Sequence, residues 1–510
     1  MTTNSHTPEP VPMTGMPSTL SSAGRSAAWV AISKWLGLIS GLASLVFVAR
    51  LLTPADFGIY GYLLLVLVVP EIFTSDSLNE VLIQRGELRR EHEASVLLSS
   101  LMFAGLFFSI IQVFAGPIAG LFNTPELEMY LRVMSIVLFI GALTAVPAAL
   151  LQRNMQFRQV ATVDVIGYVV GAVVGISSAL IFKNAWALVA MELSRRLVRL
   201  VFFAVFARWT PSFRTTLEDF HGLVRFNLAS LGLRMIAVSE LAIPRFFVGL
   251  VLGPAALGMF NLAMRVQDQA MQALVSPFGA IAFPVASRTQ DDRPALFRTM
   301  TAAIWIAGFI AYPAFIGAAA IAPLAIPFVF GEQWTGAVTA IQLSLLMGLR
   351  LPTASFNGGV LKGVGRPGLL LKVSCFSVVL LLITIPLAST LNLEWVMLAL
   401  TAQKFVSWGL SGWAVYIAIK YPISNQVLAG WSVLISALVM GAGIYWLQMT
   451  LPTELAVVIR LLAAISAGIL LYFAMLSLTA RSGFFRGLRV AKLFMTGKSG
   501  PAMEMLKGAI

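Results

Sequence analysis

LTPADFGI, residues 52–59, recurs 200 residues further along the chain as LGPAALGM, residues 252–259. Both copies read L-x-P-A-x-x-G followed by an apolar residue, and each lies between two long apolar stretches. A second pair supports the repeat, because PIAGLF at 117–122 resembles PLAIPF at 323–328, at an offset of 206. A membrane protein with two similar halves is most often a transporter whose substrate path lies between them.

The composition is that of a chain whose solvent is a lipid bilayer. Of 510 residues, 58% are hydrophobic and 11% are charged, with a mean hydropathy of +0.88, whereas soluble chains carry about 25% charged residues. The single cysteine, Cys375, excludes an intramolecular disulfide. His6, His92 and His221 lie too far apart to predict a metal site. The predicted fold class is an all-α polytopic membrane protein without metal or cofactor.

A membrane-spanning helix needs about 20 mostly apolar residues. Pro, Gly and charged residues divide the chain into about fourteen such stretches, at 25–49, 57–82, 95–116, 127–150, 161–182, 185–207, 221–248, 255–285, 297–321, 336–361, 368–390, 393–418, 425–449 and 455–479. The pair at 297–321 and 336–361 is the least regular, because Pro313, Pro323 and Pro327 interrupt it. Residues 1–24 are rich in Ser, Thr and Pro and lack a basic n-region, so we expect a disordered tail rather than a signal peptide.

Lysine and arginine concentrate on alternate connections between these stretches, which sets the orientation of the chain. The alternate, poorly basic connections hold only Arg50, Lys183 and Arg245. The other set is basic at nearly every turn, and both termini are therefore predicted to be cytoplasmic. The net charge of +13 is then mainly a topology signal, and nucleic acid is not an expected partner. The basic tail at 481–510 either lies on the anionic inner leaflet or is solvated.

The sequence predicts a transporter rather than an enzyme. The expected outer connections at 391–392 and 450–454 are very short, which leaves no external domain of the kind that polysaccharide polymerases and ligases need. No G-x-x-x-x-G-K-[ST] motif occurs, so nucleotide hydrolysis is not expected. No nucleophile–base pair is visible either, and no catalytic residue is assigned.

Four motifs, taken in order, resemble the Wzx-type polysaccharide flippases of the MOP superfamily, particularly the branch that serves exopolysaccharide and colanic-acid-like export. They are FVARLLTPADFG at 47–58, LIQR at 82–85, LQRNMQF at 151–157 and KGVGRP at 362–367. The resemblance spans roughly residues 25–420. It implies two pseudo-symmetric six-helix lobes around a central cavity, at 25–215 and 216–420, with two further helices at 421–480.

The resemblance also implies a substrate and a cellular location. The implied substrate is a polyprenyl-pyrophosphate-linked oligosaccharide for exopolysaccharide or lipopolysaccharide biosynthesis. The protein would flip it by alternating access across the bacterial inner membrane. Membrane lipids, the polysaccharide polymerase and the chain-length machinery are the other expected partners. The sequence departs from the family pattern in FTSDSLNE at 73–80, where related chains tend to have small residues and a glycine. The family's substrate type therefore cannot simply be assigned to this chain.

Two other functions remain open. A MATE-like multidrug or cation antiporter of the same superfamily predicts an acid-dominated cavity, which the excess of arginine disfavours. A membrane-embedded glycosyl polymerase or ligase predicts a catalytic outer loop.

Charged residues at membrane depth are functional candidates, because an unpaired charge there costs about 2.5 kcal/mol or more. The densest set is Glu192, Arg195, Arg196 and Arg199, which share one helix face. Because Glu192 is expected to neutralise only one arginine, the three arginines are predicted to attract the pyrophosphate or acidic sugars. The alternative is an ion network within one lobe, formed through Asp164.

Arg234 and Arg265 are predicted near mid-depth, about 13 and about 11 residues from the ends of their helices. In the resembled fold these helices line the cavity, and the planar guanidinium suits bidentate binding of phosphate. The pair is therefore predicted to hold the pyrophosphate. The alternative for Arg265 is an i,i+3 pair with Asp268.

Lys34 and Arg350 complete the predicted substrate-binding set, although Lys34 can instead snorkel to the surface and Arg350 can bind carbonyls freed by a proline kink. Asp76 and Glu80 lie one turn apart on one helix face, where their repulsion favours a retained proton. They are candidates for ion coupling, and the alternative is pairing with the arginines.

Other residues near or within the helices are assigned structural roles. Lys404 is predicted to be structural. Trp334, Trp395 and Tyr421 lie near predicted helix ends and are expected to anchor at the membrane interface.

Overall fold

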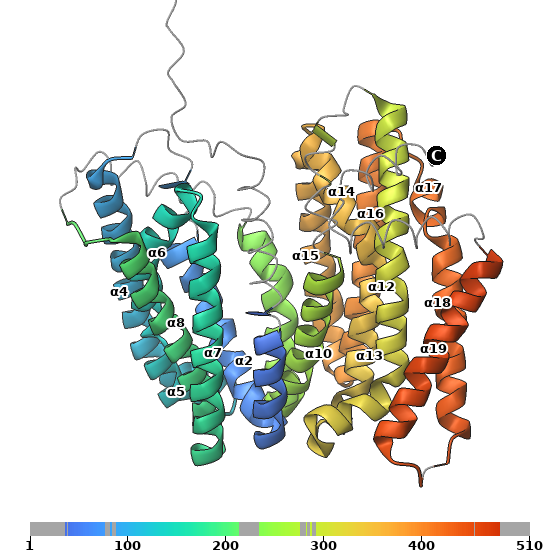
Figure 1. Ribbon diagram of the computed structural model, residues 1–510. Coiled ribbons are helices and arrows are strands. Elements are labelled where there is room, and N and C mark those ends of the chain that lie inside the picture. Colours follow the sequence, from blue (N-terminus) through green and yellow to red (C-terminus); the bar gives the residue numbers. More distant parts are fainter. Residues whose placement is uncertain are drawn as a thin grey trace, which may run out of the picture.

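The computed structural model describes residues 36–37, 39–76, 82–83, 88–213, 234–275, 282, 286–287, 292–452 and 454–479. Every element in these ranges is a helix, and the helices form two bundles side by side (Figure 1). The first bundle holds the helical stretch 39–51, α2 (Pro54–Glu71), η1 (Ile72–Asp76), α4 (Arg90–Leu121), α5 (Leu127–Met134), α6 (Val137–Arg153), α7 (Phe157–Phe182) and α8 (Trp186–Ala207).

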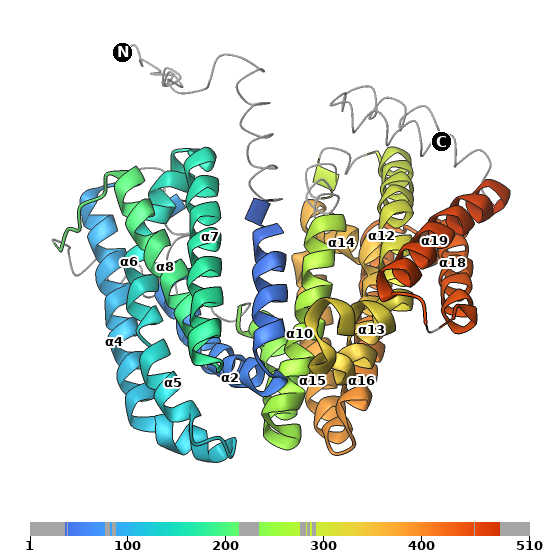
Figure 2. The same cartoon turned by 60° about the horizontal axis from the view of Figure 1, so that its bottom comes forward.

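The second bundle holds the helical stretch 234–247, η2 (Val248–Leu252), α10 (Gly253–Leu274), α12 (Arg293–Phe330), η3 (Glu332–Ala337), α13 (Val338–Met347), η4 (Gly348–Arg350), α14 (Leu351–Gly363), α15 (Pro367–Ser389) and α16 (Leu393–Ile419). α17 (Ile423–Leu428), α18 (Trp431–Thr450) and α19 (Val457–Thr479) follow, and the last two pack on α12 beyond the second bundle (Figure 2).

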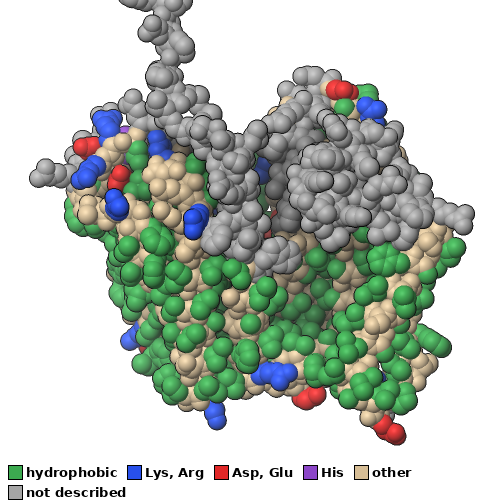
Figure 3. Space-filling view, in the orientation of Figure 1, with side chains coloured by type: hydrophobic (Ala, Val, Ile, Leu, Met, Phe, Trp, Pro, Cys, Tyr) green, Lys and Arg blue, Asp and Glu red, His purple; other side chains and the backbone are tan. Residues whose placement is uncertain are grey.

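The helices are those of a membrane protein. Ten of them within the described ranges are long and apolar enough to cross a bilayer. In Figure 3 hydrophobic side chains cover a broad middle band, and charged side chains gather toward its two edges. This confirms the prediction of an all-helical polytopic membrane protein.

The proline-rich region departs from the expected pattern. α12 runs unbroken from Arg293 to Phe330 through Pro313, Pro323 and Pro327. Membrane helices tolerate proline where neighbouring groups satisfy the backbone carbonyls that it leaves free. The irregularity instead falls in the next predicted helix, where η4 tightens the chain into a 3-10 turn just before Pro352.

The duplicated motif joins the two bundles. The first copy opens α2 with a capping box, in which the Thr53 side chain accepts from the Asp56 N–H and the Asp56 carboxylate accepts from the Thr53 N–H (2.9 Å). The second copy opens α10 at Gly253, whose φ of +83° lies in the left-handed region that favours glycine. Both copies place their proline in the first helical turn, where no N–H is lost.

The two copies touch reciprocally. A Cβ on Gly58 would lie 2.8 Å from the Cα of Pro254, and a Cβ on Gly258 would lie 2.8 Å from the carbonyl carbon of Pro54. Such paired contacts, i with j and j with i, are what a twofold relation produces. Only glycine lets the backbones approach so closely. We call this contact between α2 and α10 the seal (Figures 1 and 2).

Further hydrogen bonds cross between the bundles near the seal. The Tyr62 hydroxyl donates to the carbonyl of Gly249 (2.8 Å). Arg50 donates to the carbonyls of Val329 (2.8 Å) and Phe328 at the end of α12. The Trp334 indole donates to the carbonyl of Ala49 (2.8 Å).

The interfacial assignment of the aromatic residues is wrong for two of three. Trp334 and Tyr421 are fully buried, and the Tyr421 hydroxyl lies 2.6 Å from that of Thr301. Trp395 is 51% exposed, as expected of an interfacial residue. A buried indole or phenol is stable when its polar atom finds an internal partner, and position near a helix end does not reveal such a partner.

Candidate functional site

Away from the seal the two bundles diverge. They meet at α2 and α10, and their described helices separate toward the opposite end (Figure 1). Because charged side chains inside spanning segments cannot face lipid, the polar residues of these helices either pair within a bundle or face the other bundle.

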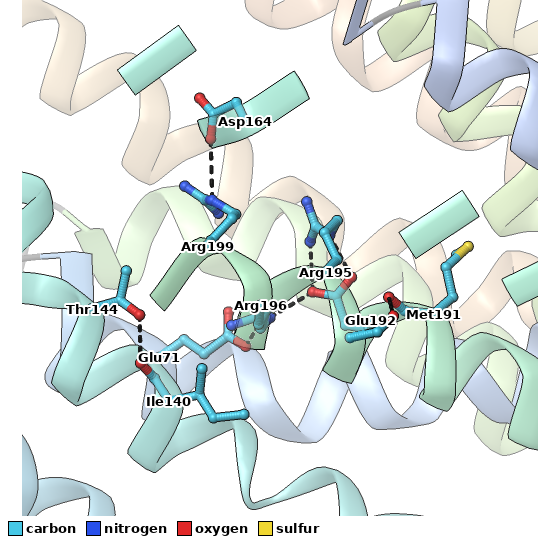
Figure 4. A network of polar contacts seen from close by, with 10 residues as sticks. Glu71, Ile140, Thr144, Asp164, Met191, Glu192, Arg195, Arg196 and Arg199 are labelled. Atoms are coloured by element: carbon cyan, nitrogen blue, oxygen red, sulfur yellow. Dashed lines mark hydrogen bonds and ion pairs between the residues drawn. The ribbon is translucent and has the colours of Figure 1, made fainter. Parts of the chain in front are cut away.

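The face of α8 that carries the three arginines predicted to attract the substrate forms an ion network (Figure 4). Buried Glu192 accepts from Arg195 (2.6 Å and 3.0 Å) and from Arg196 (2.5 Å). Arg196 also reaches Glu71 at the end of α2 (2.8 Å), and Arg199 pairs with Asp164 of α7 (3.1 Å).

The expectation of leftover positive charge on this face is therefore wrong, because Glu71, Asp164 and Glu192 balance the three arginines. Sequence reasoning named Asp164 as an alternative partner. It missed the contact of Arg196 with Glu71, which comes from a distant helix.

A glycine stripe makes room for the arginine stems. Gly167, Gly171 and Gly175 recur every fourth residue on α7 and face α8. A Cβ on Gly171 would lie 3.1 Å from the Cβ of Arg195, which is closer than side chains normally pack. Small residues at this spacing allow two membrane helices to approach closely. The network is thus built into the contact between α7 and α8.

The second bundle holds a smaller buried cluster. Lys404 of α16 donates to Glu240 in the stretch 234–247 (2.8 Å), which agrees with the predicted structural role of Lys404. Arg350 also interacts electrostatically with Glu240. Its buried Nε has no hydrogen-bond partner among the residues that the structure describes.

Arg265 of α10 is half-buried, and within the described ranges no carboxylate pairs with it. The suggested pair with Asp268 is absent there, and Asp268 interacts electrostatically with Arg245 instead. Tyr60 of α2 interacts with the charges of both Arg265 and Arg195. Each bundle therefore brings a basic side chain near Tyr60.

The structure describes only some of the other predicted site residues. Arg234 is half-buried at the start of its described helical stretch. Lys34, Glu80 and the side chain of Asp76 lie outside what the structure describes. Ion coupling through Asp76 and Glu80 stays a prediction.

Among the described residues at membrane depth, positive charge is concentrated in the second bundle. In the described part of the first bundle, three acids offset three arginines through the network on α8. In the described part of the second bundle, the acids Glu240 and Asp268 are outnumbered by a basic set, namely Arg234, Arg245, Arg265, Arg350 and Lys404. The described helices therefore offer an anion more attraction from the second bundle than from the first.

Comparison with known proteins agrees with this architecture. A family model described as polysaccharide biosynthesis protein matches residues 47–339. The chain is 26% identical to the succinoglycan biosynthesis transport protein ExoT of Rhizobium meliloti, over 92% of this chain and 95% of that one. It is 23% identical to the teichuronic acid biosynthesis protein TuaB of Bacillus subtilis, over 90% and 96%.

Among solved structures, the lipid II flippase MurJ in its inward closed conformation matches with a TM-score of 0.69 at 14% identity, over 89% of this chain and 98% of that chain. This likeness shows a shared fold. The family model covers more than half of the chain and confirms the resemblance carried by the motif at 47–58. The protein belongs to the polysaccharide biosynthesis protein family.

Proposed function

We propose that the protein flips polyprenyl-pyrophosphate-linked oligosaccharide repeat units across the bacterial inner membrane by alternating access, for exopolysaccharide or lipopolysaccharide biosynthesis. The observation that carries this function is a pair of bundles joined at one end by the duplicated motif, each of which brings a basic side chain, Arg195 or Arg265, near Tyr60. Relatives named for succinoglycan transport and teichuronic acid biosynthesis support a polymer-precursor substrate. The basic surplus of the second bundle disfavours the MATE-like alternative.

We also propose the finer architecture: fourteen spans, six-helix lobes at 25–215 and 216–420, and both termini in the cytoplasm. Described helices lie near each predicted stretch between residues 39 and 479, which supports the count. The polymerase and chain-length machinery stay predicted partners. Substrate contact by Lys34, Arg195, Arg196, Arg199 and Arg350 also stays a prediction.

Reporter fusions test this topology. Fusions after Lys183 and after Leu391 should read as periplasmic, and a fusion after Arg366 should read as cytoplasmic, because arginine-rich connections stay inside. Alkaline phosphatase and green fluorescent protein activities give the two signals. An inverted signal at any of the three sites contradicts the proposed orientation.

Arg234 and Arg265 are proposed to hold the anionic headgroup. Arg234→Ala and Arg265→Ala should each lower polysaccharide export by about 10-fold to 100-fold, since a charge-assisted hydrogen bond contributes about 1.5–3 kcal/mol. Lysine at either position should rescue only partly, because it loses the bidentate geometry. Export is measured as surface polysaccharide normalised to the amount of the protein in the membrane.

Arg132→Ala is the matched control. Arg132 pairs with Glu128 at the protein surface, with side chains 51% and 41% exposed, and such pairs contribute little. Export should therefore be unchanged in this variant. Wild-type export from both the Arg234→Ala and the Arg265→Ala variants would rule out the assignment.

A further inference from the structure

A polar stripe runs along α10. Asn261, Arg265 and Gln269 follow one another every fourth residue and so share one helix face. Asp268 and Gln272 lie beside them on the same side and are exposed. Exposed polar and charged groups within a spanning helix cannot face lipid. This face of α10 therefore lines an aqueous space.

The stripe faces the first bundle. The same face of α10 begins with Gly258 at the seal. One turn further on, the Asn261 amide stands against Gly61 of α2. Further along, the Gln269 Nε2 lies 4.0 Å from the place of a Cβ on Gly41. The stripe thus follows the side of the first bundle from α2 to the helical stretch 39–51.

The two amides of the stripe carry unused hydrogen-bonding capacity. The Asn261 Oδ1 accepts from Arg245 Nε (3.0 Å), but its buried Nδ2 has no partner among the described residues. The buried Oε1 of Gln269 has none there either. A buried polar atom without a partner costs about 1–3 kcal/mol, and native proteins keep few of them. An unused donor and an unused acceptor on either side of an arginine point to a ligand.

The corresponding face of α2 has no such groups. At the 200-residue offset of the repeat, Asn261, Arg265 and Gln269 correspond to Gly61, Leu65 and Val69. The duplicated face is thus polar in one copy and apolar in the other. Hydrogen bonds that distinguish one headgroup from another can come from α10 and not from its counterpart.

We infer that Gln269 accepts a hydrogen bond from a sugar hydroxyl of the substrate, and that Asn261 donates one to the pyrophosphate held by Arg265. This assignment rests on the proposed function as a flippase of a lipid-linked sugar. Four residues of helix rise by about 6 Å, which suits a phosphate and the sugar attached to it that follow one another along the stripe. An ionised phosphate oxygen only accepts, so it suits the Asn261 Nδ2, whereas a sugar hydroxyl can donate to the Gln269 Oε1.

Two lipids distinguish this role from a structural one: polyprenyl pyrophosphate that carries one hexose, and the same lipid without the sugar. Binding of both to the purified full-length protein in detergent is measured by native mass spectrometry. Gln269→Met should bind the hexose lipid about threefold to tenfold more weakly, as expected for one lost hydrogen bond, and should leave binding of the bare lipid unchanged. Asn261→Leu and Arg265→Gln should each weaken binding of both lipids.

Gln342→Leu is the control. The Gln342 Nε2 donates to the Ala319 carbonyl within the second bundle (2.9 Å), so its loss should leave the preference for the hexose lipid unchanged. Because Asn261 also holds Arg245, Gln269→Met alone carries the test if Asn261→Leu does not fold.

The possible outcomes separate the two proposals. Equal weakening of both lipids by Gln269→Met, or unchanged binding of the hexose lipid, overturns the role of the stripe. A wild-type protein that binds neither lipid overturns the proposed function, and the role of the stripe with it. A wild-type protein that prefers the hexose lipid, with a preference that Gln269→Met abolishes, supports both.

Discussion

Gly58→Val and Gly258→Val should each prevent closure of the seal and lower polysaccharide export more than about 100-fold. The added side chain would overlap the backbone of Pro254 or Pro54, which cannot rotate away as a side chain can. Separation of α2 from α10 also breaks the nearby bonds of Tyr62, Arg50 and Trp334. At about 1 kcal/mol each, the loss of three of these bonds shifts the closed population by about 100-fold.

A buried cysteine at the seal reports this opening. In a Cys375→Ser background, Leu52→Cys places a thiol at a position that is 1% exposed. A membrane-impermeant maleimide added from outside should label it rapidly in the valine variants and slowly otherwise. Gly105→Val on α4 is the control, since a Cβ there meets no atom within 4 Å. Normal export and slow labelling in both valine variants at the seal would refute its role.

Loss of Glu192 should destabilise the first bundle by about 3–5 kcal/mol, since Glu192→Gln leaves buried arginine charge without its partner. We expect low membrane abundance and a lower melting temperature in detergent. Glu128→Gln, which removes an exposed partner of Arg132, should have little effect on either measurement.

A double variant tests whether the unpaired arginine charge causes the loss of stability. Glu192→Leu with Arg195→Leu removes the acid together with one arginine, while Arg196 keeps its pair with Glu71. Replacing a buried ion pair with apolar groups is often neutral, so the double variant should be more stable than Glu192→Gln. Wild-type stability of Glu192→Gln would show that the network contributes nothing to folding.

The helices of the described chain could be predicted from the sequence because the signals for them are local. Apolar length marks a span, and the L-x-P-A-x-x-G copies mark two helix starts that the structure places at α2 and α10. Pro323 and Pro327 misled the prediction for α12, because whether a proline breaks a membrane helix depends on its neighbours in space.

The candidate site was less predictable because ion pairing depends on distances between helices. Arg196 and Glu71 lie 125 positions apart in the chain, and no helical period connects them. The stripe of Asn261, Arg265 and Gln269 is different. Its period of four is visible in the sequence, but an amide does not stand out as a charge does, and only the structure shows that two of its atoms have no partner.

The reciprocal contact at the seal also explains which residues of the repeat are identical in both copies. Pro54 contacts Gly258 and Pro254 contacts Gly58, so each contacting pair is divided between the two halves of the chain. Thr53 and Asp56 form a capping box inside one copy, and the other copy has Gly253 and Ala256 at these positions. After a duplication, positions that serve one half alone are free to drift, whereas positions that touch the other half are held by it. The two copies thus preserve each other's proline and glycine.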